Sequence, residues 1–192
     1  MKFLILIFAT PLAEAFTKPI SNELTFRSSD QCSCSCPKCT NTAHPGYCES
    51  GWTYYNETDA CYKNLLNSDF NNAEKVCITT GGHLTSIHSE EENFFIAELA
   101  RSGISHTDCC GWATWIGLKR YNGSWAWTDG TTVDFVKWGP GEPNNWENSQ
   151  DCVFVAADFY ADQKKAAGHQ KWSDYGCTVS MRSYVCKKNA LH

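Results

Sequence analysis

The sequence of 192 residues lacks the signatures of several large protein classes. It carries 16 Lys and Arg against 21 Asp and Glu, a formal net charge of −5, which argues against a nucleic-acid binder because such proteins carry a basic patch. No apolar run approaches the roughly 20 residues that span a bilayer. His-Glu-x-x-His, Gly-x-Ser-x-Gly and a glycine-rich phosphate loop are all missing, so we do not expect an enzyme of the corresponding classes.

Cysteine, by contrast, is abundant, and the start of the chain decides how its 12 cysteines are interpreted. Residues 1–15 read MKFLILIFATPLAEA, with a cation at Lys2, an apolar run and a small-x-small end at Ala13–Ala15. This pattern is typical of a secretory signal peptide. It predicts a secreted, extracellular protein, in which cysteines form disulfides.

Residues 16–47 are polar and contain four closely spaced cysteines, Cys32, Cys34, Cys36 and Cys39. Closely spaced thiolates can bind zinc. In a secreted protein, however, cysteines favour disulfides, so we interpret this region as a cross-linked N-terminal segment. These bonds lie within the segment or join chains into a disulfide-linked oligomer. The adjacent Cys109 and Cys110 form a strained vicinal bond, or one of them pairs with the N-terminal cluster.

From Cys48 onward the pattern predicts alternating strands and helices. Segments 51–55 and 60–63 are typical of two short strands, and Cys48 and Cys61 are placed to staple such a hairpin. Apolar residues at helical spacing predict a helix over Phe70–Ile78, ended by Gly81-Gly82.

A second helix is expected after Ser89, which begins a capping box in which Glu92 reaches back. Its apolar stripe is predicted to be Phe94, Phe95, Leu99 and Ala100. Four later segments are strand candidates, and these are 115–118, 125–127, 152–155 and 184–186. The long stretch from Thr128 to Asp151 is rich in Gly, Pro, Asn and Asp, and such loops are usually functional.

Several separated motifs occur in a fixed order: Trp115-Ile-Gly-Leu118, Glu142-Pro-Asn144, Asp151-Cys152 and Trp172-Ser-Asp174. Together with the cysteines they resemble a C-type lectin-like domain over residues 48–188, followed by a tail at 189–192. The resemblance implies an α+β fold, with two helices packed on small antiparallel sheets and a long binding loop. It also implies the disulfides Cys48–Cys61, Cys77–Cys186 and Cys152–Cys177.

The resemblance implies a Ca²⁺ site that also holds two vicinal sugar hydroxyls. Glu142, Asn144 and Asp174 match the family's ligand positions for metal and sugar, and Glu-Pro-Asn is associated with mannose-type sugars, whereas Gln-Pro-Asp would mark a galactose-type site. Two further metal positions depart from the pattern: Gln150 replaces a glutamate and Ser173 an asparagine. Because ligand charge tunes Ca²⁺ affinity, we expect a weakened site.

Aromatic residues suggest how a sugar would be contacted. Trp115, Trp127 and Trp172 occupy core positions of the family pattern, whereas Trp146 follows the Glu-Pro-Asn motif and is the candidate for stacking on a sugar ring. Asn56 and Asn122 begin glycosylation sequons. The expected function is therefore Ca²⁺-dependent binding of glycans or glycoproteins. The alternative is a metal-independent module that binds proteins.

Overall fold

The computed structural model describes residues 45–105, 113–159 and 168–192. The predicted signal peptide, the Cys-rich segment and the Cys109–Cys110 pair lie outside these residues. The chain divides into the units Met1–Thr42 and Ala43–His192, and the described residues all belong to the second. Within them, no helix is long and apolar enough to cross a membrane.

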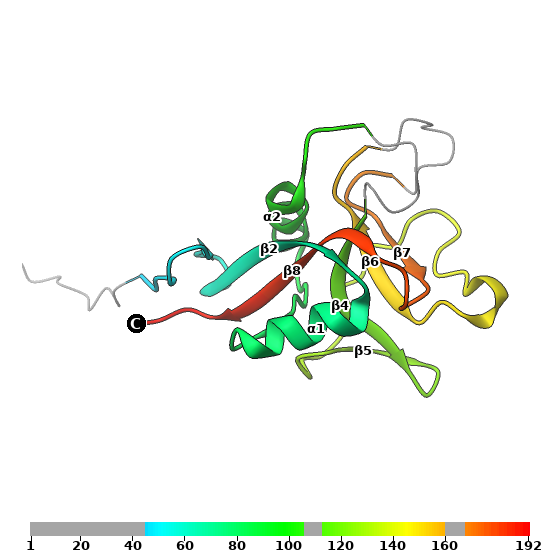
Figure 1. The fold of residues 1–192 in the computed structure, drawn as a ribbon, viewed down its shortest axis with the longest axis horizontal. Helices are drawn as coiled ribbons and strands as arrows, with labels where there is room; N and C mark the ends of the chain where they lie inside the picture. Colours follow the sequence, from blue (N-terminus) through cyan, green and yellow to red (C-terminus); the bar gives the residue numbers. More distant parts are fainter. Residues whose placement is uncertain (1–44, 106–112, 160–167) are drawn as a thin grey trace, which may run out of the picture. The chain divides into compact units, whose positions relative to one another are not determined.

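The described part of the second unit contains two α-helices, one short 3₁₀ turn and eight strands (Figure 1). In chain order the elements are β1 Thr53–Tyr55, β2 Ala60–Ser68, α1 Phe70–Thr79, β3 His83–Leu84, α2 Glu90–Ala100, β4 Ala113–Tyr121, β5 Ser124–Trp127, η1 Trp146–Asn148, β6 Cys152–Ala156, β7 Trp172–Tyr175 and β8 Met181–Asn189. The expected α+β fold is confirmed. Strands β3 and β7 were not among the predicted ones.

The strands join into one sheet with the order β1-β2-β8-β4-β6-β7, while β3 pairs with β8 and β5 pairs with β4. Every pairing between these strands is antiparallel except that between β4 and β8, where Thr114 lies opposite Ser183 and Trp115 opposite Tyr184. The sheet is therefore mixed and continuous. The β4–β6–β7 part carries the long loop, which leaves β5 and returns to β6 (Figure 1).

Helix α1 packs its predicted face into the core. Asp69 caps the helix by accepting a hydrogen bond from the Asn72 amide at 3.0 Å. Phe70, Ala73 and Cys77 are buried, as expected from their helical spacing, whereas Val76, predicted on the same face, is 38% exposed. The Phe70 ring meets Trp115 edge to face, with 5.6 Å between centroids.

Helix α2 begins at the predicted cap, where Ser89 Oγ accepts from the Glu92 amide at 3.0 Å. The Glu92 carboxylate reaches back to the His88 amide at 2.8 Å, one residue before the Ser89 amide that a capping box would use. Its buried face differs from the predicted one, because Phe94 is 54% exposed while Ile96 and Ala97 are buried. The reason is that the helix also buries the polar residue Glu92, which turns Phe94 outward.

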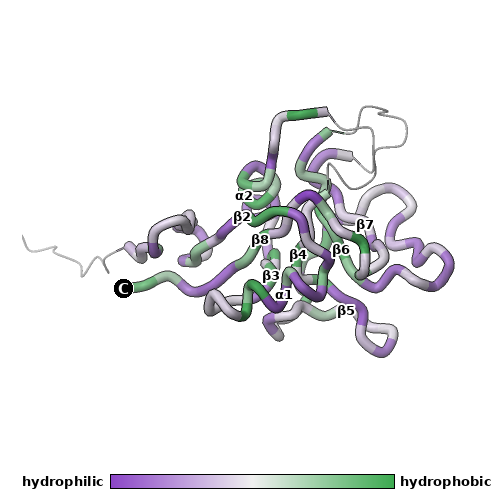
Figure 2. The backbone as a smooth tube through the Cα atoms, in the orientation of Figure 1, coloured by the Kyte–Doolittle hydropathy of each residue, from purple (hydrophilic) through white to green (hydrophobic). Residues whose placement is uncertain are grey.

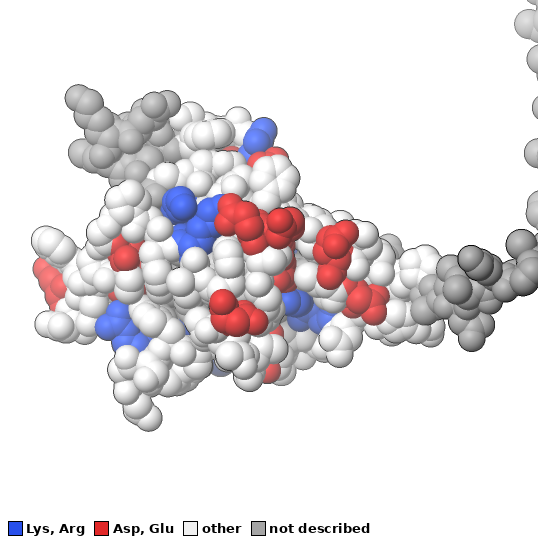
Figure 3. All heavy atoms as spheres, turned by 180° about the vertical axis from the view of Figure 1, so that it is seen from behind, with Lys and Arg blue, Asp and Glu red and all other residues white. Residues whose placement is uncertain are grey.

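Figure 3 shows acidic side chains gathered on the face of the molecule opposite to that of Figure 1.

Two clusters of buried residues form the core of the domain. Trp127 and Trp172 belong to one cluster and Trp115 to the other, so the predicted core role of all three is confirmed. Figure 2 shows β6 as a hydrophobic segment. This core supports the base of the long loop.

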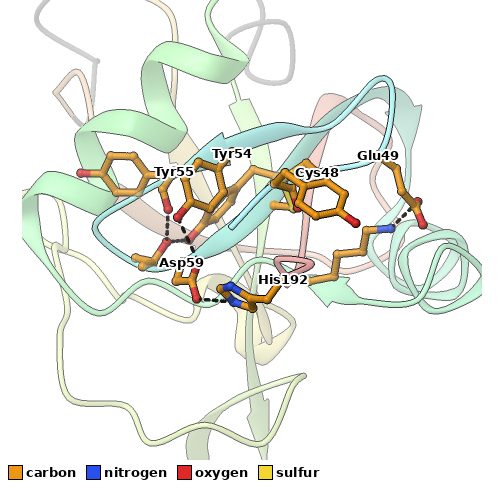
Figure 4. The surroundings of a disulfide bond; sticks show 11 residues. Cys48, Glu49, Tyr54, Tyr55, Asp59 and His192 are labelled. Carbon is orange, nitrogen blue, oxygen red and sulfur yellow. Dashed lines mark hydrogen bonds and ion pairs between the residues drawn. A yellow bond between two sulfur atoms is a disulfide. The ribbon is translucent and has the colours of Figure 1, made fainter. Parts of the chain in front are cut away.

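Three disulfides join the described cysteines in the pairing that the family resemblance implied: Cys48–Cys61, Cys77–Cys186 and Cys152–Cys177. The second connects α1 to β8 across 109 residues of sequence. Around the first, Asp59 accepts a hydrogen bond from the Tyr54 hydroxyl and pairs with His192 at 2.8 Å (Figure 4). The last residue of the sequence is thus tied to the first hairpin.

Candidate functional site

Strand β7 anchors the long loop through its backbone. Trp172 donates its amide to the Lys137 carbonyl, and its own carbonyl accepts from the Gly139 amide, both at 2.8 Å. Two residues further along β7, the buried Asp174 accepts from the Asn144 amide on Oδ1 and from the Asn145 amide on Oδ2, both at 2.9 Å. One buried carboxylate therefore positions the Glu-Pro-Asn segment.

The segment itself turns sharply. The Glu142–Pro143 peptide bond is cis, and Asn145 takes a left-handed conformation with φ 45°. The Asn144 side-chain amide donates to Glu142 Oε1 at 2.9 Å. These contacts place the Glu142 and Asn144 side chains next to each other and close to Asp174.

Gln150 joins this group from the far end of the loop. Its Oε1 and the Asn144 Oδ1 both accept from the Trp146 amide at 2.8 Å. The structure thus brings together four of the five predicted metal ligands: Glu142, Asn144, Gln150 and Asp174. Ser173 is 6% exposed and, within the described residues, makes no side-chain hydrogen bond to the other four.

Two carboxylates of the group, Glu142 and Asp174, lie close to each other. Burial and the nearby Asp174 carboxylate raise the pKa of Glu142 to about 7. Glu142 Oε2 is buried and has no hydrogen-bond partner among the described residues. A buried carboxylate oxygen without a partner is costly, and either a proton shared with Asp174 or a bound cation would satisfy it.

The donor set can be compared with the needs of Ca²⁺, which takes six to eight oxygen ligands. Two carboxylates and two amide oxygens supply donors of the right kind, and the unpartnered Glu142 oxygen fits such an ion. Within the described residues, no group of three or more His, Cys, Asp or Glu side chains could hold a metal. A Ca²⁺ ion at this position would have to take most of its ligands from the two amide oxygens and from water.

Sequence reasoning missed one residue of this site, Arg120 on β4. Its Nη2 donates to Asp174 Oδ2 at 3.1 Å, and its Nε lies 3.7 Å from Asp151 Oδ1. Lys119 pairs with Cys152 across β4 and β6, which puts Arg120 next to Asp151. The only signal in the sequence is a cation two residues after the Trp-Ile-Gly-Leu motif.

Trp146 lies at the surface of the loop. It starts the short turn η1 and is 67% exposed, whereas the three core tryptophans are almost fully buried. Its backbone amide donates to the Asn144 and Gln150 side chains, so Trp146 adjoins the ligand group through its backbone. This position suits contact with a molecule bound there.

The sheet, the two helices and the cis-Pro loop define a C-type lectin-like domain, and comparisons with known proteins agree. A family model for the Lectin C-type domain matches residues 67–188. The C-type lectin lectoxin-Lio1 of Erythrolamprus poecilogyrus is 34% identical over 145 residues, covering 73% of this chain and 79% of that protein. The type-2 ice-structuring protein of Brachyopsis segaliensis is 34% identical over 146 residues, covering 75% and 74%. The chain belongs to the C-type lectin domain family.

Solved structures show the same range of relatives. A calcium-independent type II antifreeze protein superposes with a TM-score of 0.62 at 31% identity, covering 78% of this chain and 99% of that one. The cow C-type carbohydrate-recognition domain of CD23, solved in the presence of a GlcNAc2Man3 oligosaccharide, also gives 0.62, at 27% identity and 77% and 99% coverage. The relatives thus include both lectins and antifreeze proteins.

Proposed function

We propose that this domain binds mannose-type glycans through its long loop, with Ca²⁺ held by Glu142, Asn144, Gln150 and Asp174. The observation that carries the proposal is the buried Glu142 oxygen, which has no partner among the described residues and lies close to a second carboxylate. We leave out Ser173, the fifth predicted ligand, because within the described residues its side chain makes no hydrogen bond to the other four. A bound Ca²⁺ would take two vicinal sugar hydroxyls into its coordination shell.

The chain's own groups then orient the sugar. The Glu142 carboxylate accepts from sugar hydroxyls and the Asn144 amide nitrogen donates to them, as their chemistry allows. Asp174 accepts hydrogen bonds from the Asn144 and Asn145 backbone amides and so holds the loop segment that carries Glu142 and Asn144. Trp146 offers an exposed ring face for the apolar side of the sugar.

Calorimetric titration of the oxidised full chain with Ca²⁺ tests the metal, and elution from mannose resin with EDTA tests the sugar. Glu142→Gln should abolish retention, because it removes one of two carboxylates. Glu147→Gln makes the same chemical change at an exposed position of the same loop and should leave retention intact. Absence of Ca²⁺ binding at millimolar ion would exclude the proposal.

Trp146→Ala tests the aromatic contact separately. Specific contacts of aromatic rings contribute roughly 0.5–1.5 kcal/mol beyond burial, so the dissociation constant for mannose should rise several-fold while Ca²⁺ affinity stays the same. Trp52→Phe, at a half-buried position just before β1, serves as the tryptophan control. Equal sugar affinity in Trp146→Ala and wild type would remove Trp146 from the site.

A metal-independent, protein-binding role is the second candidate. Arg120 on β4 already balances the charge of Asp174, so the site has a protein cation beside it. One structural relative is itself described as calcium-independent. Binding that survives EDTA and is directed at proteins rather than at a glycan array would favour this role.

We infer that the protein acts outside the cell, because residues 1–15 direct its secretion. We also infer that Asn56 and Asn122, both exposed, carry glycans. Expression in eukaryotic cells should release the chain into the medium. Glycosidase treatment should increase its electrophoretic mobility in two steps, one for each glycan, and Asn56→Gln and Asn122→Gln should each abolish one of these steps. Non-reducing electrophoresis of the same material tests for a disulfide-linked oligomer, and retention of the chain inside the cells would contradict secretion.

A further inference from the structure

Arg120 lies on β4, where its backbone and its guanidinium both contact the protein. Its backbone amide donates to the Asp151 carbonyl at 2.7 Å, which fixes it beside the start of β6. Its guanidinium lies over the Trp125 ring, 4.6 Å from the centroid. The side chain is only 19% exposed, so its direction is set by the protein and not by solvent.

The guanidinium reaches the carboxylate on which the loop depends. Asp174 Oδ2 accepts from both Arg120 Nη2 at 3.1 Å and the Asn145 amide at 2.9 Å. The Asp174 side chain is fully buried, whereas Asp151, the second carboxylate beside Arg120, is 51% exposed. Screening is weak around a buried pair, so the contact with Asp174 dominates.

This contact changes the charge of the proposed Ca²⁺ site. Glu142 and Asp174 carry the negative charge of the ligand group, and the Arg120 cation offsets one of these two charges. Ligand charge is one of the main determinants of Ca²⁺ affinity. A fixed cation on one carboxylate therefore competes with the metal for the same oxygen.

We propose that Arg120 is a positioning residue that replaces metal as the counter-ion of Asp174, holding the loop folded without Ca²⁺ and lowering its Ca²⁺ affinity. The part that concerns Ca²⁺ rests on the proposed function. The part that concerns the loop does not, because it follows from contacts that involve no metal. The two parts predict effects of opposite sign in one variant.

The test compares Arg120→Gln with Arg120→Lys in the oxidised full chain. Arg120→Gln should unfold at a lower temperature than wild type in EDTA and regain the difference in saturating CaCl2. Its Ca²⁺ affinity, measured by calorimetry, should rise roughly ten-fold, since one ligand carboxylate is released. Arg120→Lys keeps the charge but loses the planar guanidinium over Trp125, so its Ca²⁺ affinity should stay closer to wild type than that of Arg120→Gln, and its unfolding temperature in EDTA should fall less.

A purely structural role would lower Ca²⁺ affinity in Arg120→Gln, because a loosened loop binds worse. An affinity that is unchanged or lower therefore overturns the competition, and an unchanged unfolding temperature in EDTA overturns the role in the loop. If neither wild type nor Arg120→Gln binds Ca²⁺, the proposed function and the competition both fail, while the EDTA measurement still decides the role in the loop. Arg120→Met, which keeps an apolar contact over Trp125, replaces Arg120→Gln should that variant not fold.

Discussion

The buried carboxylate of Glu92 connects three parts of the fold, and its removal should destabilise the domain strongly. Its Oε1 accepts from the Tyr62 hydroxyl at 2.6 Å and from Lys187 Nζ at 2.7 Å. Its Oε2 accepts from the His88 amide at 2.8 Å. Burial and the Glu92 charge raise the pKa of Tyr62 above its usual value, so the phenol remains a donor.

The variant Glu92→Gln keeps the shape and removes the charge. One amide oxygen cannot accept all three hydrogen bonds, and the Lys187 ammonium, with its side chain 17% exposed, loses the carboxylate that it pairs with directly. Removal of one partner from a buried ion pair costs roughly 3–5 kcal/mol. Because Lys187 keeps two 3.3 Å contacts with Ser86 and some access to water, we expect the lower end, about 3 kcal/mol.

Urea unfolding of the oxidised chain, followed by tryptophan fluorescence, measures this difference. Glu91→Gln is the matched control, because Glu91 is the preceding residue of α2 and is exposed. The double variant Glu92→Gln/Lys187→Met should lose less than the sum of the single losses, since it leaves no unpaired ammonium. A loss in Glu92→Gln that equals the loss in Glu91→Gln, or full additivity in the cycle, would refute the reasoning.

Two further changes test the packing and the cross-links. In Gly117→Ala the new Cβ would overlap the Leu84 carbonyl, so we expect a loss of about 1–3 kcal/mol in the same urea assay, and a loss under about 0.5 kcal/mol would contradict the close approach. Replacement of Cys77 and Cys186 by Ala opens a link across 109 residues and should cost roughly 4–5 kcal/mol. Thermal unfolding at or near the wild-type temperature would show that this disulfide does not stabilise the fold.

Local patterns in the sequence predicted the elements that depend on local physics. Helix α1 shows its face through the spacing of Phe70, Ala73 and Cys77, and the start of α2 through Ser89 and Glu92, because caps and helical periodicity act within a few residues. The β2, β4, β5, β6 and β8 segments are marked by apolar or aromatic residues. The disulfide pairing came from family resemblance, since spacing alone does not determine connectivity.

The predictions were wrong or incomplete where residues distant in sequence determine which side chains are buried and which segments form strands. Phe94 was expected in the core on hydropathy, yet the buried face of α2 includes Glu92 because Tyr62 and Lys187, from β2 and β8, satisfy its carboxylate. Strand β7 was missed because Ser173 and Asp174 are polar. Its ladder with β6 pairs Phe154 with Ser173 and Val153 with Asp174. Neither the burial of Glu92 nor strand β7 can be predicted from a short stretch of the sequence around it.

Arg120 shows why a ligand motif alone does not define a metal site. Glu142, Asn144 and Gln150 lie within one loop, so their proximity can be anticipated, whereas Arg120 is 54 residues from Asp174 in sequence. Its charge nonetheless acts on the same carboxylate that positions the loop. Two relatives with identical ligands would therefore differ in Ca²⁺ affinity if one carried a neutral residue at this strand position. The charge of such a site has to be counted over every side chain that reaches its carboxylates, including those outside the motif.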